Sequence, residues 1–186
     1  MDILNILTTR RSTKTLNAPA PDELQWDTIL QAATQVPDHG HLTPWRFVVI
    51  HSAAGMARFQ QILRDTAEQS PFGAEAIAKA ERVGKMAPAV AAVIYSPKKG
   101  KPEWEQNLSA GCSAYAIQLA AKAHGFDSVW ISGMWVHSPL LRQAFACTEQ
   151  EKIIGLMMVG TSPAVVDMPK NTDTCLLYTS DAADER

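Results

Sequence analysis

The sequence contains few cysteines, and they lie far apart. Only three of its 186 residues are cysteine, at Cys112, Cys147 and Cys175, and no two of them form a C-x-x-C pair. A disulfide framework or a zinc site needs cysteines at closer spacing. We therefore expect reduced thiols, as in a cytoplasmic protein.

Long apolar runs and a strong charge of either sign are also absent. No apolar run approaches the roughly 18 residues of a membrane span. The N-terminal stretch MDILNILTTRRS lacks the basic start and long apolar core of a secretory signal. The formal net charge is −2, which gives no electrostatic reason to expect nucleic acid or an anionic membrane as partner. We expect a soluble, cytoplasmic globular protein.

The signatures of three common enzyme classes are missing. No predicted strand is followed by G-x-G-x-x-G or by a phosphate-binding P-loop, so neither a Rossmann dinucleotide site nor an NTPase is supported. The sequence also lacks G-x-S-x-G, the turn that carries the nucleophile of many hydrolases. The sequence therefore offers no nucleophile motif that would support a hydrolase.

The sequence does contain helices and buried strands that alternate irregularly in a chain long enough for one full core. Apolar runs of strand length lie at residues 47–50, 89–95, 129–131 and 153–160. Helical patterns cover residues 3–7, 23–36, 56–86 with a break near 70–73, 105–124 and 138–146. In the second of these helices, Leu24, Ile29, Leu30 and Ala33 are expected to face inward. The pattern predicts an α+β fold, or an α/β fold with one sheet.

The longest predicted helix, residues 105–124, is apolar on almost every face. Leu108, Cys112, Tyr115 and Leu119 form one stripe, and alanines cover most of the remainder. A helix of this kind is usually buried. Its small residues would let a second backbone approach closely, as a central or intersubunit helix requires. Gly125 ends the helix, and the strand after it stops at Ser132 and Gly133.

A basic cluster follows the first helix, as Arg10-Arg-Ser-Thr-Lys14. Guanidinium groups and hydroxyls form charge-assisted hydrogen bonds with a phosphate monoester, so the cluster could hold a phosphate-bearing cofactor. The alternative is a solvated, basic helix terminus. Charge alone favours that alternative.

The loop of residues 37–47 contains Asp38, His39 and His41, three possible metal ligands. Two histidines with one residue between them need at least one further ligand, and the sequence offers no second cluster. We predict no metal site. A metal protein remains an alternative that elemental analysis would decide.

Three stretches in this order resemble the FMN-dependent nitroreductase family, in particular its small, YdjA-type NAD(P)H members. They are RRSTK at 10–14, PDHGHLTPWRF at 37–47, and WEQNLSAG at 104–111 continuing to GFDSVWISG at 125–133. The resemblance covers about residues 1–165. It implies a nitroreductase-like α+β fold with a central, mostly antiparallel sheet flanked by helices. It also implies a homodimer in which the long helix forms much of the contact, with FMN at the interface.

The resemblance also implies which residues bind FMN. Arg10 and Ser12 would hold the phosphate with Arg11 nearby, and Lys14 would lie close to the ribityl chain or the pyrimidine edge. A cation at that edge stabilises the anionic reduced flavin. Gln35, where arginine would be expected, and His39 would contact FMN from the other subunit. The backbone of the strand end would face the flavin ring, at Ile131, Ser132 and Gly133.

The implied reaction is ping-pong hydride transfer. NADH or NADPH passes hydride to flavin N5 and leaves, and a nitroaromatic, quinone or similar small acceptor is then reduced. The flavin carries the redox chemistry, so we name no catalytic residue. The alternatives are a dehydrogenation or dehalogenation on the same scaffold, or a flavin-binding protein without turnover. In the same subgroup, the segment associated with the nicotinamide nucleotide corresponds to Ala121, Lys122, Ala123, His124, Gly125 and Phe126.

The last twelve residues, 175–186, do not continue the pattern of the chain. They resemble translated adapter sequence, which is sometimes found at the ends of metagenomic reading frames. We therefore expect a single domain over residues 1–174, followed by a tail that is not native.

Overall fold

The computed structural model describes residues 2–163, so the tail expected at 175–186 lies outside the described residues. The helices, with one 3-10 turn η1, are α1 Ile3–Thr9, α2 Glu23–Ala33, α3 Ala53–Glu68, α4 Gly73–Gly84, α5 Glu103–Ala123, η1 Gly133–His137 and α6 Pro139–Ala144. The strands are β1 Trp45–Ile50, β2 Ala89–Tyr95, β3 Asp127–Ile131 and β4 Lys152–Gly160. Within residues 2–163, no helix has both the length and the apolarity to cross a membrane.

The four strands form one sheet in the order β1-β2-β4-β3, and every neighbouring pair is antiparallel. The predicted α+β fold with an antiparallel central sheet flanked by helices is confirmed. Every residue of β2 is buried, as its continuous apolar run predicts. Strands β1 and β3 form the two edges of the sheet, and the outer side of β3 pairs with the N-terminal segment through a bridge between Ser12 and Ser128.

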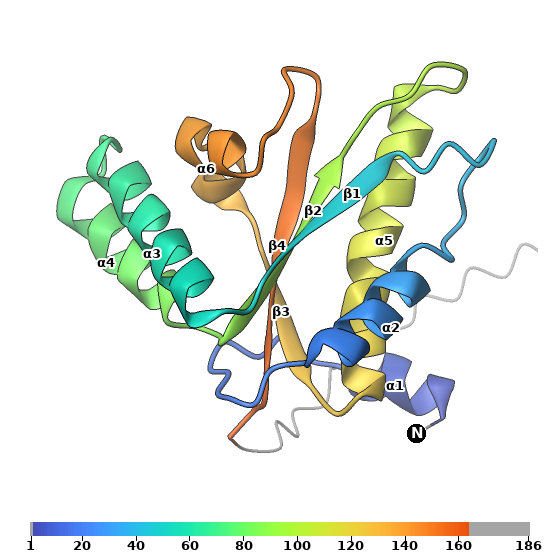
Figure 1. The fold of residues 1–186 in the computed structure, drawn as a ribbon, viewed down its shortest axis with the longest axis horizontal. Coiled ribbons are helices and arrows are strands. Elements are labelled where there is room, and N and C mark those ends of the chain that lie inside the picture. The colour runs from blue at the N-terminus through green and yellow to red at the C-terminus, as the bar shows by residue number, and fades with distance from the viewer. Residues whose placement is uncertain (1, 164–186) are drawn as a thin grey trace, which may run out of the picture.

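Helices cover both faces of the sheet (Figure 1). Alternate residues of β2 point to opposite faces: Val90, Ala92 and Ile94 pack with α3, α4 and α6. Ala89, Ala91 and Val93 pack with α2 and α5. The long helix α5 thus lies on one face, and the pair α3 and α4 lies on the other.

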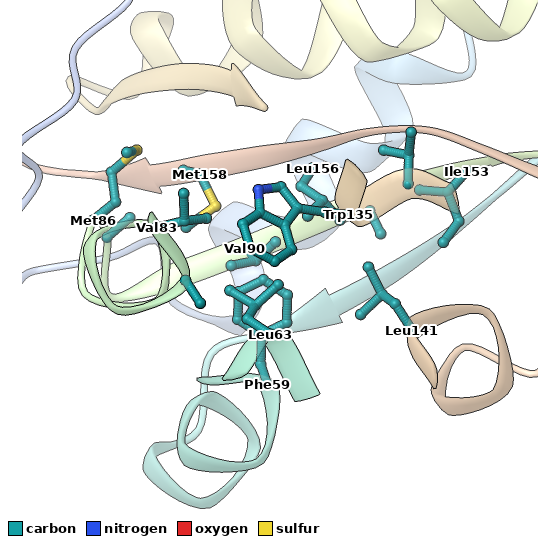
Figure 2. Packing of buried hydrophobic residues seen from close by; sticks show 14 of the residues in the cluster. Phe59, Leu63, Val83, Met86, Val90, Trp135, Leu141, Ile153, Leu156 and Met158 are labelled. Atoms are coloured by element: carbon teal, nitrogen blue, oxygen red, sulfur yellow. The ribbon is translucent and has the colours of Figure 1, made fainter. Parts of the chain in front are cut away.

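Trp135 is the largest side chain without solvent exposure, and it lies in the core on the α3 side. Figure 2 shows its indole ring among Val90, Leu63 and Leu156. Because Trp135 lies in η1, two residues after its first residue Gly133, this packing anchors the turn that follows β3.

The structure corrects the predicted inward face of α2. Leu24 is 79% exposed, whereas Trp26, Ile29 and Ala33 are buried. Trp26, Ile29 and Ala33 follow helical spacing, and Leu24 lies about 200° around the axis from Trp26. The helix begins at a capping box between Asp22 and Gln25, and it ends at Ala33 instead of 36.

The structure also corrects the expectation that α5 is buried on almost every side. The stripe predicted from its apolar residues is open to solvent in the single chain, because Leu108 is 60% exposed and Tyr115 39% exposed. Cys112 on the same stripe is exposed. Small and polar residues form the buried face instead, among them Ser109, Ala110, Ser113, Ala114 and Gln118.

Candidate functional site

The basic segment 10–14 lies along the edge strand β3. Ser12 forms a parallel bridge with Ser128, and the Thr13 backbone N–H donates to the Ser128 carbonyl over 3.1 Å. Two residues beyond Lys14, the Leu16 N–H donates to the carbonyl of Met86, which lies two residues after the last residue of α4. The segment therefore connects the open edge of the sheet to α4.

Arg10 carries two polar atoms that lack a partner among the described residues. Its Nε and Nη1 are buried, and neither donates a hydrogen bond within residues 2–163. The guanidinium carbon lies 5.8 Å from the centroid of the Tyr115 ring on α5. Buried donors without an acceptor are costly, and a guanidinium is suited to a bidentate phosphate or carboxylate. Arg10 thus has two buried donors that an anion could satisfy.

A cavity of about 580 Å³ opens at the end of β3. Lys14, Ile131, Ser132 and Gly133 all line it, so the fold brings together four of the predicted site residues. Gly133 has φ +78°, and a Cβ built on it would have no atom within 4 Å. The backbone at this turn is therefore open to close approach by a flat ligand.

Two cations of α4, Lys79 and Arg82, line the same cavity, and sequence reasoning did not find them. They come from a helix nearly fifty residues before the β3 end, and no local motif marks them.

The close contact at Gly155 was also not predicted from the sequence. The Trp130 indole lies against Gly155, where any Cβ would collide with it, and donates a 3.3 Å hydrogen bond to the Ile154 carbonyl. A glycine inside a strand was the signal for this close approach.

The two remaining predicted flavin contacts lie elsewhere in the chain. Gln35 lines a second cavity of about 660 Å³, between the end of α2 and the loop before β1, and this cavity shares no lining residue with the first. His39 lies in that loop, and its Nδ1 is 2.6 Å from Glu105 Oε2 on α5. Within one chain, Gln35 and His39 therefore do not join Lys14 at the β3 cavity.

Two of the three possible metal ligands of this loop, Asp38 and His39, form other contacts. The Asp38 carboxylate accepts a 2.7 Å hydrogen bond from the Thr43 backbone N–H, and His39 pairs with Glu105. Nowhere in residues 2–163 do three His, Cys, Asp or Glu side chains converge on a metal position.

The segment 121–126, which was predicted to contact the nicotinamide nucleotide, lies at the opposite end of β3 from the cavity, and none of its residues lines that cavity. Ala121 and Phe126 are buried in the core on the α5 side. Lys122 forms a 2.8 Å ion pair with Asp127. In this conformation, only the exposed His124, Gly125 and Ala123 offer a surface to a ligand.

The model of the "Nitroreductase family" matches residues 7–161. This chain belongs to the nitroreductase family. A nitroreductase relative from Haemophilus influenzae, named "Putative NAD(P)H nitroreductase", is 46% identical over 87% of this chain and 89% of its own. YdjA of Escherichia coli K12, which carries the same description, is 40% identical over 87% of this chain and 88% of its own.

Solved structures confirm the nitroreductase-like fold. A nitroreductase-like protein from Bacillus cereus superposes with a TM-score of 0.80 at 21% identity, covering 92% of this chain and 91% of the other. A nitroreductase with bound FMN from Bacteroides fragilis gives 0.77 at 16% identity, covering 96% and 98%. At these identities the likeness concerns the fold alone.

In this nitroreductase-family chain, one ion pair ties the loop before β4 to β1. Arg46 Nε and Nη2 donate to the two carboxylate oxygens of Glu151 over 2.7 and 2.9 Å, and Nη2 also reaches the Phe145 carbonyl. The Glu151 side chain is only 7% exposed. The hydrogen bonds from Arg46, helped by the Thr148 N–H and opposed by burial, lower the pKa of Glu151 from 4.5 to about 2.

We expect this pair to make stability depend on pH in the acid range. A carboxylate whose pKa is lower in the folded state stabilises the protein above its unfolded pKa, and this contribution is lost as pH falls from about 5 towards 2. The shift from 4.5 to about 2 corresponds to at most about 3 kcal/mol. Urea unfolding at pH 7, 5, 4 and 3 should show wild type and Glu151→Gln converging in stability as pH falls. Curves that stay parallel would contradict this role.

Proposed function

We propose that this protein is an FMN-dependent NAD(P)H oxidoreductase that reduces nitroaromatic, quinone or similar acceptors. Family membership and the nitroreductase names of its relatives support an oxidoreductase. FMN is the cofactor in the description of the Bacteroides fragilis structure. The observation that carries the proposal in this chain is Arg10, which has two buried donors without an acceptor among the described residues. Arg10 begins the segment 10–14, and Lys14 at the other end of that segment lines the β3 cavity.

The residues present fit such a cofactor. Arg10, with Ser12 and Arg11 beside it, would hold the phosphate, because its buried Nε and Nη1 have no acceptor within the described part of the chain. Lys14, which lines the cavity, would place a positive charge near the cofactor's ring system. Ile131, Ser132 and Gly133 would offer their backbone to the ring, since Gly133 leaves that approach open.

When bound, the flavin supplies the redox chemistry, accepting hydride from NADH or NADPH and delivering it to the acceptor. The chain itself supplies position and charge. A cation near the flavin favours the extra negative charge of the reduced form, which is the contribution expected of Lys14. The Trp135 ring, buried behind the Gly133 turn, keeps that turn in place.

We also propose a homodimer in which α1 and α5 meet a second copy. In the single chain, these two helices expose large apolar side chains, namely Ile3, Leu4, Leu7, Trp104, Leu108 and Tyr115. A Cβ built on Gly111 of α5 would meet nothing within 4 Å, so a second backbone could approach there. Gln35 and His39 would then contribute to the site of the partner subunit, which would explain why they lie apart from Lys14 within one chain.

Replacing Leu108 with glutamate should convert the dimer to monomers. A charge buried in an apolar contact without a partner costs several kcal/mol, so dissociation should become at least about tenfold easier. Light scattering during size-exclusion chromatography measures the mass directly. Leu24→Glu is the matched control, because Leu24 is 79% exposed on α2, outside the proposed contact. Wild type that elutes as a monomer would exclude the dimer.

The test of the function is the visible absorption spectrum of the purified protein, before and after anaerobic NADH and then NADPH. Flavin bands that bleach, and recover when a nitroaromatic or quinone is added, support the reductase. Bound flavin that neither donor bleaches supports the second candidate, a flavin-binding protein without turnover. Protein that stays colourless after incubation with FMN rejects the proposal.

A further inference from the structure

The β3 cavity is lined by positive charge. Three cationic side chains, Lys14, Lys79 and Arg82, lie on its wall, and no described residue on that wall is acidic. A concave site with one sign of charge and apolar walls concentrates ligands of the opposite sign. The cavity therefore favours an anion.

Lys79 and Arg82 are not neutralised within the described part of the chain. Neither forms an ion pair or side-chain hydrogen bond there. Glu81, the acid beside Arg82, pairs instead with Arg64 at 3.2 Å. Lys14 is proposed above to lie beside the flavin. Lys79 and Arg82 are then two cations of the cavity wall to which no contact has been assigned.

A smaller cavity of about 310 Å³ adjoins the first, and Lys79 lines both. Its other walls come from Phe72, Glu75 and Ala76 around the start of α4, and from Met134, the residue after Gly133. Phe72 is 67% exposed, which is costly for a ring of this size unless something covers it. Aromatic and thioether side chains pack well against a flat aromatic ring.

We propose that the acceptor site selects aromatic compounds that carry an anionic substituent. The ring would pack against Phe72 and Met134, and the anionic group would lie beside Lys79 with Arg82 adding to the field. This inference rests on the proposed reductase function and narrows its substrate class. Glu75, four residues before Lys79 on α4, lines only the smaller cavity, and its negative charge would repel an anionic group there, so that group would lie on the side of Lys79 that faces Arg82 and the β3 cavity.

Two nearly isosteric acceptors, 4-nitrobenzoate and neutral 4-nitrobenzamide, test the proposal. Their intrinsic reactivity differs, so the quantity to compare is the ratio of their kcat/KM values in each variant of the FMN-loaded enzyme. Replacing Lys79 with methionine keeps the length of the side chain and removes the charge. The ratio should fall by about fivefold, the effect of about 1 kcal/mol from one partly exposed ion pair. Arg82→Met should act in the same direction, and raising the salt concentration should reduce the wild-type preference.

Lys85→Met is the matched control, since Lys85 follows α4 but lines a different cavity, between α3 and α4. Flavin content and bleaching by NAD(P)H are measured in each variant. Phe72→Ala should raise KM for both aromatic acceptors by a similar factor, so that the ratio of their kcat/KM values stays close to that of wild type. An unchanged ratio in both Lys79→Met and Arg82→Met, or an equal fall in Lys85→Met, overturns the inference and leaves the reductase intact. Failure of wild type to reduce either acceptor, while a quinone still reoxidises the bleached flavin, overturns the inference alone; bleached flavin that no acceptor reoxidises overturns both.

Discussion

Replacing Arg10 with alanine should weaken FMN binding by about ten- to one-hundredfold. Charge-assisted hydrogen bonds to a phosphate are worth about 1.5–3 kcal/mol, and Arg10 has two buried donors placed to make them. Titration of the apoprotein with FMN, followed by quenching of flavin fluorescence, gives the dissociation constant. Arg10→Lys keeps the charge but loses the planar fork, so its effect should be intermediate.

The apoprotein provides a second measurement of the same substitution. If Arg10 is placed for a ligand, its unsatisfied buried donors cost the empty protein free energy, and the alanine variant should unfold at an equal or higher urea concentration than wild type. A structural role would instead lower stability and FMN affinity together. Arg58→Ala, at an exposed position of α3, is the control. Unchanged FMN affinity in Arg10→Ala would remove Arg10 from the phosphate site.

The Trp135→Ala substitution should destabilise the fold by about 3–5 kcal/mol, the range for emptying a large aromatic site in a packed core. Trp135 has no solvent exposure and packs in the cluster that joins α3, α4 and α6 to the sheet. Urea unfolding of the apoprotein measures the loss, and FMN titration should show weaker binding because the Gly133 turn loses its support. Trp135→Phe should recover part of the stability.

Leu24→Ala is the control for burial, because a side chain that is 79% exposed should cost no more than about 0.5 kcal/mol when shortened. A similar small loss in Trp135→Ala would mean that the site collapses around the missing ring. It would also mean that the turn after β3 is held by other contacts.

Local patterns were sufficient for most of the secondary structure. The run Ala89–Tyr95 is a fully buried strand, Pro139 lies at the first turn of α6, and the break near 70–73 separates α3 from α4. Each signal is set by the backbone preferences and spacing of neighbouring residues, so it can be read without knowing the fold. The prediction that Leu24 faces inward was wrong, because the buried face of α2 is the one that carries Trp26. The spacing of the apolar residues alone did not show which of these two faces is buried.

The residues of the candidate site could be predicted only in part from the sequence. The Arg10 to Lys14 cluster and the Ile131 to Gly133 turn stood out as short motifs. Lys79 and Arg82 did not, since charged residues on an amphipathic helix look like any solvated face. The pair of Arg46 with Glu151, 105 residues apart, likewise has no local signal.

The sequence by itself determined where helices and strands form, the chemistry of the basic segment and the family. Only the tertiary structure decided which of these residues meet, which side of α5 is left uncovered, and that α4 adds two cations to the β3 cavity. The physical reason is the distance along the chain over which each kind of interaction acts. Helix and strand preferences arise within a few residues, whereas contacts between distant segments depend on how whole helices pack on the sheet.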